Sequence, residues 1–273
     1  ASGNPRPLPV STGVQVHVPI FPLPDLTLFP HTVLPLHVFE ARYRALVDDC
    51  LACDRRLAVV GLKPGYEDSY EGKPAVYAVA GAGRIIRTER LATGRFNIVL
   101  RGDCRIRIES EMPSDTLYRI VRATVLPDRG ADGPAVSELA DRVKEACRRL
   151  LRAVHRSAPG MEEALAGATV PAALCDQVAS AVIPSPALRQ RLLEEVDVER
   201  RLRRLLRALD ALLARLIGAR GAGRGSGCGV LTSKIVPKGE PVWGTPARPL
   251  KQYLKRLALF DRLPKILEKL EKK

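Results

Sequence analysis

Two cysteines, Cys50 and Cys53, stand in the spacing C-x-x-C and are the first candidates for metal or redox chemistry. A zinc site needs four ligands, usually as two such pairs, and no second pair lies nearby in the sequence. Helical spacing also places Cys50 with Leu46 and Val47 on one apolar face of an expected helix. A pair of structural thiols and a redox or metal site both stay open, and we favour the first.

Histidines and glycines offer two further candidate sites. His31 and His37 lie near Glu40 and other carboxylates, which could support acid–base chemistry, yet no Ser or Cys nucleophile with an orienting partner accompanies them. The run Gly81-Ala82-Gly83 lacks the following helix whose N-terminus would hold a pyrophosphate, so we expect a strand kink or turn there. We assign no catalytic, cofactor-binding or metal-ligating residue and expect no enzyme activity.

A dense set of arginines could bind RNA. Acidic residues are interspersed among them, and strand alternation sends successive side chains to opposite faces, so a solvent-facing row of arginines is the simpler account. RNA binding stays open as the alternative. The arginines are Arg84, Arg87, Arg90, Arg95, Arg101, Arg105 and Arg107.

Formal charge divides the chain into two parts. Residues 1–199 hold 25 Lys/Arg and 25 Asp/Glu, whereas residues 200–273 hold 19 Lys/Arg and 5 Asp/Glu, so the last quarter carries the whole net charge of +14. Such a basic tail favours an anionic partner, which could be nucleic acid, a membrane surface or an acidic protein. A solvated helix face explains the same charge equally well.

Composition favours a globular protein of the cytoplasm. A hydrophobic content of 46% is enough for a core, and with only 4% aromatic residues that core must consist mainly of Leu, Val, Ile and Ala. No apolar run approaches the roughly 18–20 residues that cross a bilayer, and the N-terminus lacks the pattern of a secretory signal. Six scattered cysteines fit free thiols in a reducing compartment.

The N-terminal half is strand-like. Residues 1–13, rich in Pro, Gly and Ser, predict a disordered leader. A Pro-rich apolar block over residues 19–39 cannot form a long helix, because proline removes a backbone donor. A short helix over residues 40–53 follows, and runs such as RLAVVGL and RFNIVLRGDCRIRIES alternate with turn signals. We expect five or six short antiparallel strands in a small barrel or curled sheet over residues 14–128.

Further along, the apolar period changes to that of helices. We expect a helical subdomain over residues 134–217. One helix should start at the pair Ser185-Pro186, and Asp197 can cap the last long helix. Residues 218–229 have the composition of a flexible Gly-rich linker.

Two sequence blocks carry a resemblance to a known family. The run PIFPLPDLTLFPHTVLPLHVFEARYRALVDDCL resembles the opening of the Lon substrate-binding domain, and GRIIRTERLATGRFNIVLRGDCRIRI is similar to its second signature. The resemblance covers roughly residues 15–217 and implies an α+β fold, a PUA-like β-barrel followed by a helical bundle. In complete Lon proteases this region captures unfolded or tagged polypeptides for the attached ATPase. No G-x-x-x-x-G-K-[ST] loop is present, so we expect a binding domain without ATPase or protease modules.

The C-terminal segment, residues 230–273, has a different period. Val230, Val236 and Val242 recur every six residues, which predicts one short hexapeptide-repeat coil of a parallel β-helix, followed by two basic helices parted at Pro264. The segment resembles the C-terminus of hexapeptide-repeat acyltransferases, such as UDP-3-O-acylglucosamine N-acyltransferase. The preceding coils and the catalytic histidine of that enzyme are absent, and a single coil cannot bury its own faces. We expect a fused remnant and not an acyltransferase.

The Pro-rich apolar block is the best candidate for polypeptide contact, because unfolded chains offer apolar side chains and unpaired backbone groups. Most of its residues must nevertheless belong to the core. The leading hypothesis is non-catalytic binding of polypeptides or of a partner protein. The alternatives are a nucleic-acid-binding protein, and a tail that oligomerises or binds an acidic acyl-carrier protein. The candidate contact residues are Phe21, Leu23, Phe29, Leu34, Leu36 and Phe39.

Overall fold

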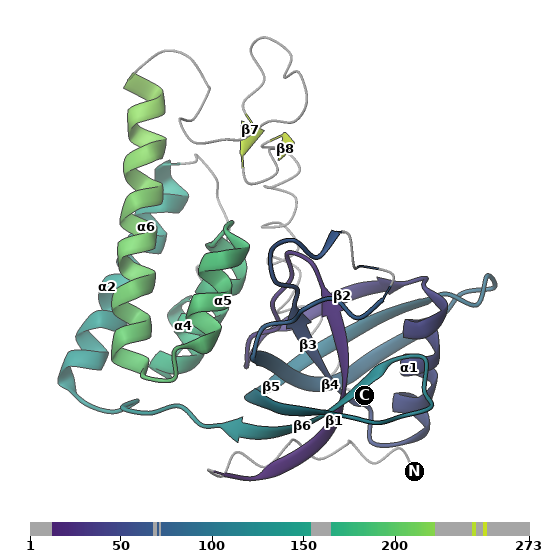
Figure 1. Cartoon of the computed structure of the whole chain (residues 1–273). Helices are drawn as coiled ribbons and strands as arrows, with labels where there is room; N and C mark the ends of the chain where they lie inside the picture. Colours follow the sequence, from purple (N-terminus) through teal and green to yellow (C-terminus); the bar gives the residue numbers. More distant parts are fainter. Residues whose placement is uncertain are drawn as a thin grey trace. The chain divides into compact units, whose positions relative to one another are not determined.

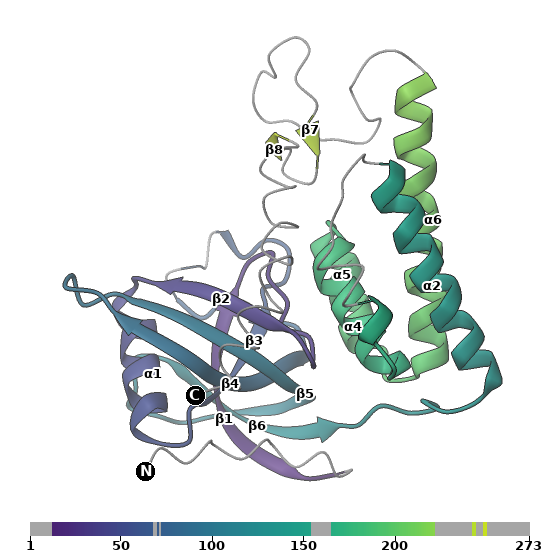
Figure 2. The same cartoon turned by 180° about the vertical axis from the view of Figure 1, so that it is seen from behind.

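The computed structural model of the chain describes residues 13–67, 70, 72–153, 165–221, 242–243 and 248–249. They belong to two compact units, whose elements are labelled in Figures 1 and 2. The first unit runs to Arg129 and includes the later segment Leu193–Val196. The second begins at Gly130, stops at Leu192 and resumes at Asp197. The chain therefore enters the first unit twice.

A six-stranded sheet forms the first unit. Hydrogen-bonded neighbours run in the order β2-β5-β4-β3-β1-β6, and β6 pairs with β5 as well. Five strands therefore close into a ring, which β2 joins only through β5, and Figure 1 shows the sheet curling around on itself. The strands are β1 (Gln15–Leu23), β2 (Val33–Val38), β3 (Arg56–Gly61), β4 (Val79–Arg90), β5 (Phe96–Met112) and β6 (Arg119–Leu126).

One strand pairing differs from the expected antiparallel pattern. Strands β1 and β3 run parallel, with Ile20 opposite Ala58. Parallel neighbours need a crossover connection, which here contains β2 and helix α1 (Ala41–Ala52). Strand β5 is also long, with 17 residues, and it pairs with β2 through its first half and with β6 through its second. The expectation of short antiparallel strands was therefore wrong for the pairing of β1 with β3 and for the length of β5, whereas the other pairings of this sheet are antiparallel.

Strand β3 is buried on both faces. Leu57 and Val59 belong to a cluster that includes helix α1, whereas Ala58 and Val60 belong to a cluster with residues of β1, β4 and β6. All four side chains are buried. An uninterrupted apolar run in the sequence is what such a strand requires, because both faces of its pleat lie away from water.

Two glycines let the chain between β1 and β2 pass directly over the sheet. A Cβ atom at Gly81 would lie 1.7 Å from the carbonyl oxygen of Leu28, and one at Gly102 would lie 2.0 Å from that of Phe29. Only glycine permits so close an approach of two backbones. The run Gly81-Ala82-Gly83 lies within β4, and the expected strand kink corresponds to a register shift between Ala82 and Gly83.

Two helices of the second unit, α5 and α6, begin where the sequence predicts. Asp197 Oδ1 accepts a hydrogen bond from the Arg200 N–H at 2.9 Å, and Ser185 Oγ accepts one from the Leu188 N–H at 3.3 Å, which confirms both predicted caps. None of the described helices is both long and apolar enough to cross a membrane. The helices are α2 (Pro134–Ala153), α4 (Pro171–Val182), α5 (Pro186–Glu194) and α6 (Val198–Gly221).

Of residues 222–273 the structure describes only two short strands. Strand β7 (Val242–Trp243) pairs antiparallel with β8 (Arg248–Pro249). The rest of the predicted hexapeptide coil, together with the basic helices, lies outside the described residues, as does the predicted leader apart from Gly13. These parts of the sequence interpretation stay predictions.

Candidate functional site

The six residues expected to contact polypeptide lie in three different environments. Phe21 and Phe29 are buried, with exposed fractions of 4% and 0%, whereas Phe39 is 59% exposed. The remaining three are partly buried and pack against the core cluster beneath helix α1. They are Leu23, Leu34 and Leu36.

Long-range packing removes two of the predicted phenylalanines from the surface. The ring of Phe21 packs against that of Tyr43 of α1, with centroids 4.2 Å apart and the two planes tilted by 30°. The backbone of Phe29 packs on Gly102. Neither contact can be read from local periodicity, because each partner is distant in sequence. As folded, Phe21 and Phe29 are core residues, and polypeptide contact by the other four stays a prediction.

Strand β2 is the outer strand of the sheet. The Gly102 N–H donates to the Thr32 carbonyl at 2.9 Å, and alternation along the antiparallel ladder then turns the backbone groups of Pro35 and His37 toward the open side. Among the described residues no strand pairs with that side. Because Pro35 has no N–H, the open side lacks its central donor, which disfavours the addition of a further strand there.

A groove of about 350 Å³ lies over strands β2, β5 and β4. It contains a hydrogen-bonded row across the three strands: His37 Nδ1 donates to Asn97 Oδ1 at 2.8 Å, and Asn97 Nδ2 donates to Glu89 Oε2 at 2.9 Å. The neighbouring row pairs Pro35 with Val99. No Ser, Thr or Cys is among the described side chains that line this groove. The arrangement suits apolar contact and hydrogen bonding.

The exposed ring of Phe39 lies close to this groove. Its centroid is 6.3 Å from that of His37, with the two rings stacked. Phe39 precedes Glu40, the N-cap residue of α1. The Glu40 carboxylate accepts hydrogen bonds from Tyr70 Oη and from Arg42 Nε, each at 3.0 Å. These bonds fix the position of Glu40 at the start of α1 and so restrict the backbone of the neighbouring Phe39.

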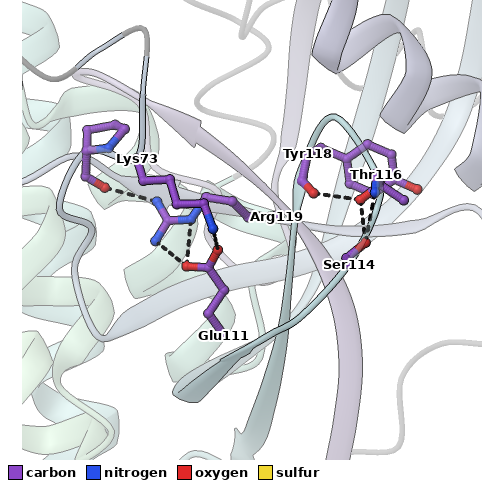
Figure 3. Close-up of polar contacts among 7 residues, drawn as sticks. Lys73, Glu111, Ser114, Thr116, Tyr118 and Arg119 are labelled. Atoms are coloured by element: carbon purple, nitrogen blue, oxygen red, sulfur yellow. Dashed lines mark hydrogen bonds and ion pairs between the residues drawn. The ribbon is translucent and has the colours of Figure 1, made fainter.

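A second exposed apolar side chain, Leu117, lies in the turn between β5 and β6 and is 68% exposed. Figure 3 shows the bonds that hold this turn: the Thr116 N–H donates to Ser114 Oγ at 3.1 Å, and Thr116 Oγ1 donates to the Tyr118 carbonyl at 2.7 Å. Tyr118 Oη also donates to Asp49 of α1 at 2.7 Å. Burial and this bond raise the pKa of Tyr118. Sequence reasoning missed Leu117 because this residue begins the apolar run LYRIVRATVLP, a pattern that is typical of a strand.

An ion-pair network holds residues 73–74, which precede β4, against strands β5 and β6 (Figure 3). The Glu111 carboxylate accepts hydrogen bonds from Lys73 Nζ at 3.0 Å and from Arg119 Nε at 3.1 Å, and Arg119 Nη1 donates to the Pro74 carbonyl at 2.9 Å. Burial would raise the pKa of Glu111, but the bonds and charges of Lys73 and Arg119 outweigh it and lower that pKa. The charged Glu111 carboxylate therefore links β5 to Arg119 of β6 and to Lys73 of the segment before β4.

The two cysteines of the C-x-x-C pair differ in burial: Cys50 is buried and Cys53 is exposed. Cys50 Sγ donates to the Arg56 carbonyl at 3.1 Å, and burial raises the pKa of the Cys50 thiol to about 12. A thiol with so high a pKa is a poor nucleophile and a poor metal ligand. Within the described part of the chain, no three His, Cys, Asp or Glu side chains are grouped so as to hold a metal ion.

The predicted solvent-facing row of arginines is wrong at two positions. Arg84 and Arg105 are only 4% and 2% exposed. Arg105 donates to the Leu193 carbonyl at 3.0 Å and to Asp128 at 3.2 Å, while Arg84 lies 3.6 Å from Asp103. Burial makes these two guanidinium groups inaccessible to a nucleic acid as the protein is folded.

The amino-acid sequence is similar to those of known proteins. The family described as "ATP-dependent protease La (LON) substrate-binding domain" matches residues 17–211. A Lon protease of Desulfosudis oleivorans is 26% identical over 197 residues, which cover 71% of this chain and 24% of the relative. Lon protease 2 of Sorangium cellulosum is 28% identical over 192 residues, which cover 69% and 24%. The chain thus matches about a quarter of the length of these relatives.

Solved structures show the same fold. The N-terminal domain of a Mycobacterium avium complex Lon protease superposes with a TM-score of 0.60 at 23% identity, covering 71% of this chain and 98% of that one. The Lon N-terminal domain protein of Xanthomonas campestris gives a TM-score of 0.52 at 26% identity, with coverage of 70% and 97%. The present chain shares with them a mixed α+β fold.

Proposed function

Because the chain belongs to the Lon substrate-binding domain family, we propose that it binds exposed segments of unfolded polypeptides and catalyses no reaction on them. The proposed binding surface, here called the β2 surface, consists of the groove over β2, β5 and β4 together with the exposed ring of Phe39 beside it. Leu117, exposed in the β5–β6 turn of the same unit, is proposed as a second apolar contact. The observation that carries the proposal is a largely exposed aromatic ring stacked beside a groove that offers both apolar and hydrogen-bonding rows.

The chemistry of the β2 surface matches that of an unfolded chain. Apolar side chains of a bound segment would cover Phe39 and the pair Pro35 and Val99. Complete burial of a Phe or Leu side chain contributes roughly 1.5–3 kcal/mol, so a few such contacts give measurable affinity. The Glu89 carboxylate can accept from backbone N–H groups of the same segment. Since Pro35 disfavours strand addition at the open side of β2, we expect the segment to lie across the face of the sheet.

The test uses the full chain and an unfolded probe of positive charge, fluorescently labelled lysozyme that has been reduced and carbamidomethylated. Binding is followed by fluorescence anisotropy. The double variant Phe39→Ser/Leu117→Ser should weaken binding at least about tenfold, equivalent to about 1.4 kcal/mol.

A matched control is available in the second unit, where Val170 and Ile217 are 53% and 57% exposed. The variant Val170→Ser/Ile217→Ser loses a similar amount of exposed apolar surface and should change binding less than about twofold. Equal losses in the two double variants would reject the β2 surface as the binding site.

Three finer assignments belong to the same proposal. The closed ring of strands supports a PUA-like barrel. Membership in the Lon family and the free thiols of Cys50, Cys53, Cys104 and Cys147 support a cytoplasmic location. Oligomerisation through the C-terminal tail is a further proposal, tested by comparing the solution mass of the full chain with that of residues 1–217.

A further inference from the structure

A second groove, of about 390 Å³, lies between helices α2 and α6 in the second unit. Leu139 of α2 and Leu206 of α6 form its apolar floor, and they are 7% and 8% exposed. Three arginines line it: Arg142 from α2, and Arg203 and Arg207 from α6. On each helix the lining residues follow the i, i+3, i+4 spacing of a single face, so the groove is a regular feature of the helix pair.

Two of the lining arginines have no partner among the residues that the structure describes. Arg203 forms an ion pair with Glu199 one turn earlier. Arg142 and Arg207 are exposed and make no hydrogen bond or ion pair with another described residue. Other cations on α2, such as Lys144 and Arg148, are paired with carboxylates of their own helix. The groove therefore presents two guanidinium groups that form no ion pair with a described residue, above an apolar floor and with one carboxylate, Glu138, in the same lining.

We propose that the groove between α2 and α6 docks an acidic segment of a polypeptide. Carboxylates of the segment contact Arg142 and Arg207, and an apolar side chain between them covers Leu139 and Leu206. A guanidinium group matches a carboxylate with two parallel hydrogen bonds, which gives direction as well as charge attraction. This site goes beyond the β2 surface, since it recognises charge and lies in the other unit.

The charges of the groove and of the C-terminal residues decide which of three possible occupants fits best. The C-terminal residues of the chain itself are strongly basic and would be repelled by the arginines. Glu138 also lines the groove and opposes the dense, continuous charge of a nucleic-acid backbone. A polypeptide can place an uncharged residue opposite Glu138 and its carboxylates opposite the arginines. An acidic segment with apolar residues is therefore the occupant that fits.

The first experiment titrates the full chain into short labelled peptides and follows anisotropy. The probe peptide carries Asp and Glu on both sides of a central Leu. One control peptide replaces Asp and Glu by Asn and Gln, and another replaces the Leu by Ser. We expect the neutral peptide to bind at least about tenfold more weakly and the Ser peptide at least about threefold more weakly. Equal binding of the acidic and neutral peptides would overturn the proposal.

The second experiment changes the protein. The variant Arg142→Gln/Arg207→Gln should weaken binding of the acidic peptide at least about tenfold, because both direct partners are lost. The control Arg149→Gln/Arg215→Gln removes the same charge from the same two helices at exposed positions that do not line the groove. It should change binding less than about threefold. Equal losses in both variants would show attraction by net charge alone and overturn the site.

Two further measurements separate this site from a nucleic-acid site and from the β2 surface. A single-stranded oligonucleotide that bound more tightly than the acidic peptide, and lost binding with Arg142→Gln/Arg207→Gln, would overturn the choice of a polypeptide. The variant Phe39→Ser/Leu117→Ser should bind the acidic peptide unchanged, and Arg142→Gln/Arg207→Gln should bind the basic unfolded probe unchanged. Failure of one proposal is therefore distinguishable from failure of the other.

Discussion

Arg201 Nη1 of helix α6 lies 3.3 Å from Asp176 Oδ1 of helix α4, and both side chains are completely buried. Removing two charged groups from water is costly, and their mutual attraction offsets that cost only while both are present. This ion pair therefore makes the register of α4 against α6 specific, because a shift of one helix would leave a buried charge alone.

The ion pair predicts a non-additive effect on stability. Replacing Arg201 alone by Leu leaves the Asp176 carboxylate buried without its cation and should lower the free energy of unfolding by roughly 3–5 kcal/mol. The double variant Asp176→Leu/Arg201→Leu removes both charges and should be clearly more stable than the single variant. Urea unfolding followed by circular dichroism measures the difference. A double variant at least as unstable as the single one would contradict this account.

Gly102 should not tolerate even a methyl group. A Cβ atom there would lie 2.0 Å from the Phe29 carbonyl oxygen, so Gly102→Ala must displace backbone on one side. We expect a loss of at least about 2 kcal/mol in the free energy of unfolding. Gly167 is the control, because an added Cβ there meets nothing within 4 Å, and Gly167→Ala should leave stability unchanged or slightly higher. Similar urea midpoints for the two variants would contradict the close backbone approach.

His31 predicts how stability changes with pH. The His31 residue is exposed overall, but partial desolvation of its ring lowers its pKa below 6.5, more than the nearby Asp128 and Asp103 raise it, while Arg105 lowers it further. The folded protein then binds fewer protons here than the unfolded chain, so stability decreases as the pH falls from 6.5 through the folded pKa.

The variant His31→Asn isolates this contribution, since asparagine tolerates the positive φ of 60° at this position. Between about pH 7.5 and pH 5 the unmodified protein should lose more stability than the variant, as measured by urea midpoints at both pH values. The same pH response in the two proteins would show that partial desolvation does not lower the pKa of His31.

Cysteine reactivity should distinguish Cys53 from the buried thiols. Burial raises the pKa of Cys50, Cys104 and Cys147 to about 12 each, whereas Cys53 is exposed. Because the thiolate is the reactive form, a disulfide reagent at pH 8 should modify the buried thiols slowly. Cys228 lies outside the described residues, so the experiment uses a Cys228→Ser background. One fast thiol should appear there and disappear with Cys53→Ser; its loss with Cys50→Ser instead would contradict the assignment.

Features set by local chemistry could be predicted from the sequence, and features set by distant contacts could not. The helix over residues 40–53 and the cap at Asp197 depend on neighbours within a few positions, and both are confirmed. The parallel pairing of β1 with β3 and the burial of Arg105 depend on segments far apart in the chain. No apolar period carries information about such pairings.

The residues of the candidate site also differ in whether local or distant contacts determine their exposure. Exposure of Phe39 follows from its position directly before a helix, where the strand alternation of β2 has ended. The backbone of Phe29, a buried residue, lies directly against Gly102, and no pattern in the Pro-rich block reveals that contact. The turn residues Pro113, Ser114 and Asp115 were the available signal that Leu117 lies in a turn and not in a strand.

The buried guanidinium of Arg105 donates to a carbonyl that lies 88 positions further along the chain, and the Arg129 N–H donates to Val196 O at 2.9 Å. A recombination event with its breakpoint just after residue 129 would separate these donors from their acceptors. Any genetic exchange that transplants the strands intact must carry the coding sequence at least as far as Val196. A recombination boundary that preserves the first unit therefore lies after Val196, well past Leu126, where β6 ends.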